Sequence, residues 1–379
     1  MPESGNKYVL FHKSYIITNS PVDVITDQLL YSTIDYSDNA GKVAEKNVEL
    51  LHDTLAFGEL LATKHANGKD WWIVTPRRNS NTFYVLKFTK DGIVDTLWQT
   101  IGIKPAPAGE GYGQIVFSPD GSKVYRTNPF NPVMVYDFDR ETGAFTHFDT
   151  ISFNYGNQPV IGEIGCAVSP SGQFLYLGCR RLLYQLDLWA PDITASQTTI
   201  AEWDGFAAPI PTQFYQMQLG PDCKIYGLAG GDTRYFHVIH YPDEPGLACQ
   251  VEQRGLPLPT PSGASMPSFP NYRLGPVDNP GLPCSPVVSA GAAPVGAAGV
   301  LVYPNPVRTT LKILAGRRCA GPMRLRLFDL AGRPVLERVF DPLEAVTEID
   351  VGELPGGAYF FELKYRGLER QVGKIMLMK

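Results

Sequence analysis

The residues best suited to chemistry in this chain are a few histidines and acidic clusters. His237-Val-Ile-His240 places two imidazoles three residues apart, which invites comparison with a metal site. The surrounding residues predict a strand, in which positions i and i+3 point to opposite faces, so the two rings cannot bind one metal ion. We therefore expect a structural or surface role for both histidines.

Two polar stretches fall where turns are expected. Residues 137–143 resemble a calcium-binding loop, but the glycine stands at position seven instead of position six. His65, Asn67 and Asp70 fall within a predicted hairpin, and the tryptophan pair that follows is expected to pack between sheets. We interpret both stretches as turns, and a ligand role for His65 stays open.

Motifs of established catalytic chemistry are missing from the sequence. The chain contains no Gly-x-Ser-x-Gly nucleophile elbow, no phosphate-binding loop, no paired metal motif and no zinc-spaced cysteines. We therefore predict no catalytic, cofactor-binding or metal-binding residue. A site assembled from separate repeats would escape such a search, so catalysis is left open.

A turn recurs along the chain with a period of 51 residues. Ser118-Pro-Asp-Gly121, Ser169-Pro-Ser-Gly172 and Gly220-Pro-Asp-Cys223 are related, and His65-Ala-Asn-Gly68 lies 53 residues before the first of them. Proline presets φ, aspartate or serine bonds its own backbone, and glycine accepts a positive φ. Each turn separates two short apolar runs, so the pattern predicts a β-hairpin in every repeat.

Two further strands are expected after each hairpin, which gives four strands per repeat. This arrangement is typical of the blades of a β-propeller. Four complete blades are predicted, at 59–103, 112–151, 164–203 and 215–258. Residues 8–51 would supply strands two to four of a fifth blade, and a strand near Met266–Leu274 would supply its first. A β-sandwich is the alternative fold.

The six cysteines make disulfides possible. Cys223 takes the place of the turn glycine between the first two strands of its predicted blade, and Cys249 lies between the last two strands. Both turns belong to one face, so these cysteines are predicted to pair. The other four, Cys166, Cys179, Cys284 and Cys319, are predicted to stay unpaired.

The charge of the chain divides it into two parts. Residues 300–379 carry 13 basic and 9 acidic residues, a net charge of +4, whereas the remainder carries a net charge of −9. An acidic main body has no basic stripe for a nucleic acid. A stretch rich in Pro, Gly, Ala and Ser separates the two parts. We therefore predict a propeller over 1–275, a linker over 276–299 and a C-terminal module over 300–379.

Several stretches of the main part resemble a known class of propellers. They include Leu30–Asp35, Lys64–Trp72, Leu219–Tyr226, Pro242–Cys249 and Met266–Tyr272. These look like the WD40/YVTN-like propellers of exported proteins in gliding-type Gram-negative bacteria. Such proteins carry more sequence before the point where this chain begins, and Met1–Lys7 has no signal-peptide pattern. We therefore expect an N-terminally truncated chain with further blades and a signal peptide upstream.

The C-terminal module is predicted to hold seven short strands, a number that suits a small immunoglobulin-like sandwich. Arg324-Leu-Arg-Leu-Phe328 alternates apolar and polar residues, which places Leu325 and Leu327 on a core face.

Four motifs of this module resemble, in order and spacing, the type IX secretion C-terminal sorting domain. Their residues are Tyr303, Pro304, Asn305 and Pro306; Asp329, Gly332 and Arg333; Gly356, Gly357 and Tyr359; and Gly373 and Lys374. The resemblance implies recognition by the outer-membrane translocon and its sortase. Release from the cell or attachment to surface lipopolysaccharide would follow.

Three functions are compatible with this organisation. The first is a non-catalytic propeller that binds a protein or a glycan at the cell surface or after secretion. The second is a propeller-type hydrolase, such as a lactonase, with its site in the central channel. The third is a structural or adhesive surface component. Carboxylates or imidazoles that converge at one mouth of the channel would favour the enzyme, and an apolar or plugged channel would favour binding.

Overall fold

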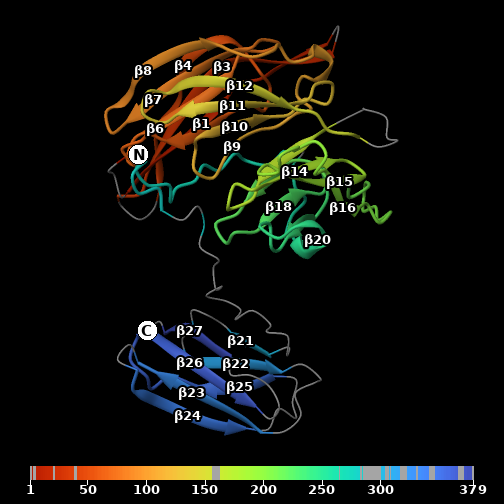
Figure 1. Ribbon diagram of the computed structural model, residues 1–379. Helices are drawn as coiled ribbons and strands as arrows, with labels where there is room; N and C mark the ends of the chain where they lie inside the picture. The colour runs from red at the N-terminus through yellow and green to blue at the C-terminus, as the bar shows by residue number, and fades with distance from the viewer. Residues whose placement is uncertain are drawn as a thin grey trace. The chain divides into compact units, whose positions relative to one another are not determined.

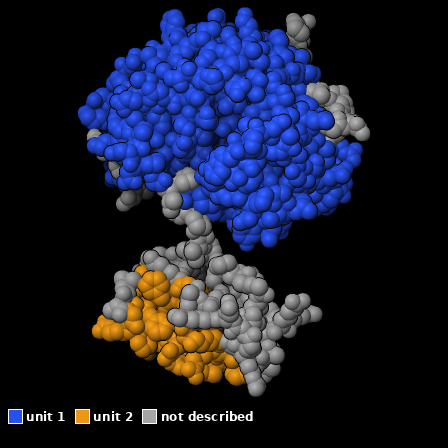
Figure 2. Space-filling model, in the orientation of Figure 1, with its two compact units in different colours: residues 1–284 blue, residues 285–379 orange. Residues whose placement is uncertain are grey.

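The described part of the chain is built almost entirely of β-strands. The computed structural model describes residues 2, 6–19, 22–37, 41–155, 163–263, 265–281, 284, 300–303, 307, 309–315, 322–329, 332–340, 346–365 and 371–377. The chain forms two compact units, Met1–Cys284 and Ser285–Lys379, coloured blue and orange in Figure 2. Figure 1 labels the strands.

Four consecutive four-stranded antiparallel sheets make up most of the first unit. Within each, the strands pair in chain order. The sheets are β5 (Leu61–Lys64), β6 (Trp71–Pro76), β7 (Thr82–Thr89) and β8 (Gly92–Thr100); β9 (Ile115–Phe117), β10 (Lys123–Arg126), β11 (Val133–Asp139) and β12 (Ala144–Ile151); β13 (Gly165–Val168), β14 (Phe174–Cys179), β15 (Leu182–Asp187) and β16 (Thr198–Glu202); and β17 (Met217–Leu219), β18 (Ile225–Leu228), β19 (Tyr235–Ile239) and β20 (Val251–Pro257). The first strand of each sheet contacts the first strand of the next, which is propeller geometry. We call these sheets blades 1 to 4.

Local turn chemistry explains the hairpin at the start of each blade. In blade 2 the Ser118 hydroxyl donates to Asp120 and accepts the Lys123 amide, and Gly121 has a φ of 74°. Blade 3 repeats this arrangement with Ser169 and Gly172. Serine and glycine at these positions close a tight turn without strain, which confirms the predicted repeat.

Apolar clusters between neighbouring blades hold them face to face. Trp72 of blade 1 is 2% exposed, and its indole N–H donates to the carbonyl oxygen of Arg140 in blade 2 at 2.8 Å. Phe83 contacts Tyr136 and Phe145 of blade 2. Burial of each such aromatic side chain contributes about 1.5–3 kcal/mol. Trp72 therefore packs between blades, as expected, whereas Trp71 is only partly buried and contacts Tyr272.

A further sheet, at the start of the chain, packs against blade 1. It contains β1 (Lys7–Lys13), β2 (Ile16–Asn19), β3 (Val22–Asp35) and β4 (Lys42–Leu55). β1 and β2 pair with successive halves of one edge of β3, and β4 pairs with β3 on the other side. The sheet is thus three strands wide with a divided edge strand, and all of its strands come from residues 7–55. This corrects the expectation that a later segment supplies its first strand.

Residues 265–281 follow blade 4 and form an extended strap instead of a strand. The Met266 amide donates to the Gln216 side chain at 3.0 Å, and the Asn271 amide group donates to the Pro119 carbonyl at 2.9 Å. The Val277 amide donates to the carbonyl of Ala66 at 3.0 Å. The strap therefore connects blade 4, the blade 2 hairpin and the blade 1 hairpin without entering a sheet.

One disulfide fixes the end of this strap. Cys223 pairs with Cys284, and their Cα atoms lie 5.2 Å apart. Cys249 is a buried free thiol, as are Cys166 and Cys179. The predicted Cys223–Cys249 pair is therefore wrong, as is the unpaired state predicted for Cys284. The prediction paired two turns of the same blade, whereas the partner of Cys223 follows the strap, 61 residues along the chain. Cys319 lies outside the described residues.

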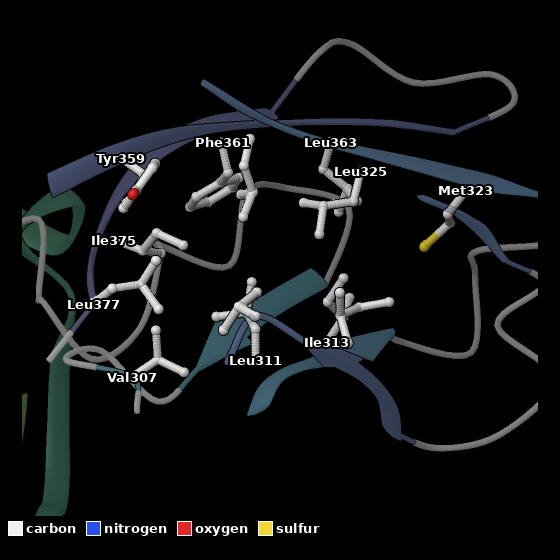
Figure 3. Close-up of a cluster of buried hydrophobic side chains, with 13 residues drawn as sticks. Val307, Leu311, Ile313, Met323, Leu325, Tyr359, Phe361, Leu363, Ile375 and Leu377 are labelled. Carbon is white, nitrogen blue, oxygen red and sulfur yellow. The ribbon is translucent and has the colours of Figure 1, made fainter. Parts of the chain in front are cut away.

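The second unit is a two-sheet sandwich. One sheet contains β21 (Val300–Tyr303), β22 (Thr310–Ala315) and β25 (Val346–Asp350), and the other contains β24 (Pro334–Phe340), β23 (Met323–Phe328), β26 (Gly357–Tyr365) and β27 (Gln371–Leu377). Figure 3 shows side chains of the two sheets meeting in one core. Leu325 and Leu327 are fully buried there, which confirms the alternation of β23.

We predict that Cys284→Ser destabilises the first unit, because it frees a chain segment of 61 residues. The loop-entropy relation gives a loss of about 4 kcal/mol in the free energy of unfolding. Urea unfolding of the full chain measures this loss, and peptide mapping under non-reducing conditions should recover Cys223 linked to Cys284. Recovery of a Cys223–Cys249 peptide would contradict the assignment. Cys249→Ser is the control, and it should leave the disulfide intact.

Candidate functional site

A cavity at the propeller axis is the leading candidate site. It lies where the first strands of the four blades converge, and the strap covers it. The axial pocket, as we call it, has a volume of about 560 Å³. It is lined by side chains of β5, β9, β13 and β17, by the face of blade 4 that turns away from blade 3, and by the strap: Leu61, Ala62, Thr63, Val116, Phe117, Ser118, Pro119, Ala167, Val168, Met217, Gln218, Leu219, Gly220, Pro221, Tyr226, Phe236, Leu256, Met266, Ser268, Phe269, Pro270, Asn271, Tyr272 and Arg273.

Most of this lining is apolar, and its rim carries exposed aromatic groups. Phe269 and Tyr272 of the strap are 60% and 66% exposed, and Leu256 of blade 4 is 38% exposed. The Tyr272 ring meets Trp71 edge-on with a centroid separation of 5.4 Å, which orients it at the rim. A concave apolar surface with a few aromatic groups at its mouth is the usual form of a ligand pocket.

The side chain of Gln114 joins three blades at the axis. Its Oε1 accepts the backbone amides of Cys166 and Met217, each at 3.0 Å, and its Nε2 donates to the Met217 carbonyl at 2.7 Å. Gln114 immediately precedes β9, while Cys166 and Met217 belong to β13 and β17. One amide group thus fixes the separation of three inner strands near the ends where they begin. The strap runs alongside β17, from Gln216 to Pro221, and reaches the end of β9 at Pro119.

Charged side chains gather where blade 1 begins, and each has a partner. Glu59 and Arg126 form a buried two-point ion pair, with Nη2 to Oε2 at 2.7 Å and Nε to Oε1 at 3.1 Å. The Lys13 ammonium donates to the carbonyls of Ala56 and Glu59, each at 2.7 Å. Burial lowers the pKa of Lys13 to about 7, against the opposing influence of Glu59. The cluster ties the first sheet to blades 1 and 2.

A third carboxylate, Glu110, lies beside this cluster. Burial raises the pKa of Glu110, although its Oε1 accepts the Phe57 amide at 2.9 Å. Across the described residues, no three His, Cys, Asp or Glu side chains are grouped so that they could hold a metal ion. The acidic groups here act in structural contacts, and no sequence motif marks them.

The histidines lie where the strand pattern predicted. His237 is 2% exposed, and its Nε2 lies 3.1 Å from the Gln213 carbonyl. His240 is on the opposite face, 2.8 Å from Glu252. Burial lowers the pKa of His237 to about 4, so this ring is neutral at physiological pH.

The two polar stretches are turns, as expected. His65 stacks on Trp72 with a centroid separation of 5.5 Å, and Asn67 caps its turn by accepting the amides of Lys69 and Asp70. In the stretch that resembled a calcium loop, Asp139 accepts the Glu141 amide between β11 and β12.

The sorting motifs that the structure describes make tight local contacts within the sandwich unit. Asp329 closes the β23–β24 hairpin by accepting both the backbone amide and the guanidinium of Arg333. The Tyr359 hydroxyl donates to the Pro355 carbonyl at 2.8 Å. Gly332 lies in the same hairpin turn as Asp329, and Gly356 and Gly357 lead into β26.

Gly373 is required by packing. A Cβ atom at this position would lie 2.5 Å from the Phe361 ring, so only glycine lets that ring cover the strand. Lys374 pairs with Phe360 in the ladder, and Tyr303 pairs with Lys312. Pro304, Asn305 and Pro306 lie outside the described residues, as do the side chains of Tyr303 and Lys374. The role of all these residues in sorting stays a prediction.

Comparison with known families identifies this second unit. Residues 301–378 match the secretion system C-terminal sorting domain. The protein is therefore exported by the type IX secretion system to the cell surface or beyond it. No helix in the described part of the chain is long and apolar enough to cross a membrane. No curated protein matches the sequence.

Solved structures with similar architecture include lactonase-type propellers. A putative 6-phosphogluconolactonase from Bacteroides fragilis is 13% identical over 63% of this chain and 68% of its own, with a TM-score of 0.38. A protein from Lactobacillus plantarum is 13% identical over 86% and 84%, with a TM-score of 0.37. A gluconolactonase from Xanthomonas campestris is 10% identical over 72% and 95%, with a TM-score of 0.35. Similarity this low carries no argument about activity.

We predict that Gly373→Leu blocks export, because the new side chain would displace Phe361 from the sandwich core. The measurement is an immunoblot of periplasm, cell surface and medium in a type IX-proficient bacterium that makes the chain with an N-terminal signal peptide. Gly373→Leu and deletion of residues 300–379 should both leave the protein in the periplasm. Val339→Ala, at a position 61% exposed on the outer sheet face, is the matched control. Normal secretion of the deletion would contradict the assignment.

Proposed function

We propose that the first unit is a non-catalytic binding module that the sorting domain delivers to the outside of the cell. Its ligand is a partner protein that inserts an apolar side chain into the axial pocket. The observation that carries this proposal is the apolar lining of the pocket, at the position where propellers that act as enzymes place their polar groups. The WD40/YVTN-like character of the blades and the immunoglobulin-like character of the sandwich belong to the same proposal.

The geometry of the rim supports a protein ligand. Phe269, Tyr272 and Leu256 stand exposed around an apolar cavity, and protein interfaces concentrate their binding energy in such aromatic anchors and pockets. The pocket is also supported from both sides. Gln114 fixes the inner strands, and the strap is held by Cys223–Cys284, so the site requires little ordering when a ligand binds.

The hydrolase alternative finds less support. A catalytic carboxylate must be able to reach a substrate, whereas Glu59 is held at two points by Arg126 and is 8% exposed. The axial pocket itself presents hydroxyl, amide and guanidinium groups among its polar side chains, and no carboxylate or imidazole. General acid–base catalysis needs a titratable group within hydrogen-bond reach of the reacting atoms.

We predict that N-acetyl amides of tryptophan, phenylalanine or leucine bind the full-length protein, and that the corresponding serine and aspartate amides do not. Saturation-transfer NMR measures this selectivity. Phe269→Ala and Leu256→Asp should each weaken binding roughly tenfold, because the first removes rim area and the second places a charge in the mouth. Tyr241→Ala is the matched control, since Tyr241 is 54% exposed on blade 4 but lies outside the pocket.

Two results would contradict this function. The first is equal binding of apolar and polar amides, or equal loss in the Tyr241→Ala control. The second is turnover of a sugar lactone by the wild-type protein that disappears in Glu59→Gln while the fold is retained. That result would establish the hydrolase.

A further inference from the structure

A second cavity, away from the axis, lies between blades 2 and 3. It has a volume of about 670 Å³. Tyr125, Val135 and Ile151 of blade 2 form its apolar floor, where they join the core shared by the two blades. The β15–β16 loop of blade 3 and the end of the strap complete its walls. We call this cavity the interblade groove. It presents a very different surface from the axial pocket.

One wall of the interblade groove is polar. Asp137 and His147 are opposite each other in the β11–β12 ladder, and Asp149 follows two residues later on the same face. Asp137 forms an ion pair with Lys123, while Asp149 accepts the Thr150 amide through one of its two oxygens. Neighbouring carboxylate and imidazole groups can accept hydrogen bonds from vicinal hydroxyl groups, and an imidazole N–H can also donate one.

Trp189 forms the facing wall. This side chain is 65% exposed, although it lines the groove beside Leu188 and Ile193. It belongs to the loop of residues 188–197, whereas the corresponding connections in blades 1 and 2 contain only residues 90–91 and 140–143. The extra length of this loop brings an indole face to the groove.

The loop that carries Trp189 is held in place from both blades. The Ser196 hydroxyl accepts the Asp187 amide at 2.8 Å, which closes the base of the loop. Thr194 donates to the Ser152 carbonyl at 2.9 Å, and the Gln197 amide both donates to and accepts from the Asn154 backbone. These bonds cross from blade 3 to blade 2. The backbone of the loop is therefore held before any ligand arrives, which lowers the conformational entropy lost on binding.

We propose that the interblade groove is a saccharide-binding site. The indole of Trp189 stacks on the C–H face of a sugar ring, and Asp137, His147 and Asp149 bind its hydroxyl groups. Three carboxylates against one lysine line the groove, so the ligand is an uncharged sugar and not an acidic polysaccharide. The groups proposed to bind the sugar do not line the axial pocket, and the ligand differs in class from the protein side chain proposed there.

The test is isothermal titration of the full-length protein with cellopentaose, mannopentaose, chitopentaose and pentagalacturonate. At least one of the three uncharged oligosaccharides should bind, and pentagalacturonate should not. Trp189→Ala should weaken binding at least tenfold, and Asp149→Asn should weaken it severalfold. Trp189→Phe should retain part of the affinity, because it keeps an aromatic face.

The matched control is Trp98→Ala, since Trp98 is 74% exposed on β8 and lies outside the groove. It should leave the affinity unchanged, as should Phe269→Ala at the axial pocket, so that failure of one site is distinguishable from failure of the other. Both tryptophans are exposed, and the thermal midpoints of these variants should match the wild type. No binding by any uncharged oligosaccharide, preferential binding of pentagalacturonate, or equal losses in Trp189→Ala and Trp98→Ala would overturn the proposal.

Discussion

The side-chain amide of Gln114 bonds to the backbones of two other blades, and the geometry of the propeller axis depends on this contact. Cys166 and Met217 are buried, so their amides would lose their partners if Gln114 were replaced by an apolar residue. Each unpaired amide would cost about 1–3 kcal/mol. The contact sets the separation of β9, β13 and β17. It thereby fixes the width of the cavity that these strands enclose.

The strap supplies the other half of this arrangement. It contacts the hairpins of blades 1, 2 and 4 through single hydrogen bonds, and the Cys223–Cys284 disulfide fixes its far end. The Gln114 contact and the strap together hold the inner strands of the blades. The connections between the outer strands can therefore differ in length. The loop that carries Trp189 is one such connection. A rigid centre with variable outer loops is the usual basis for binding on repeat scaffolds.

Features that depend on neighbouring residues were predictable from the sequence, and features that depend on distant residues were not. The hairpins at Ser118 and Ser169 follow from local turn chemistry, and the buried Leu325 follows from strand alternation. The strap and its disulfide could not be predicted, because extended backbone without a sheet leaves no periodic pattern and Cys284 lies 61 residues from Cys223. The connection between the third and fourth strands of blade 3 spans residues 188–197, against 90–91 in blade 1 and 140–143 in blade 2, and this extra length was a usable signal for Trp189.

Hydrogen exchange at the backbone amides of Cys166 and Met217 tests most directly whether the strands around the axial pocket are held in fixed positions. In the full-length protein both amides should exchange slowly, since each is buried and bonded to Gln114. In Gln114→Leu both should exchange much faster, and the amides of Met266 and nearby strap residues should lose protection with them. Exchange in the wild type as rapid as that of exposed loops, or no change in the variant, would contradict the account.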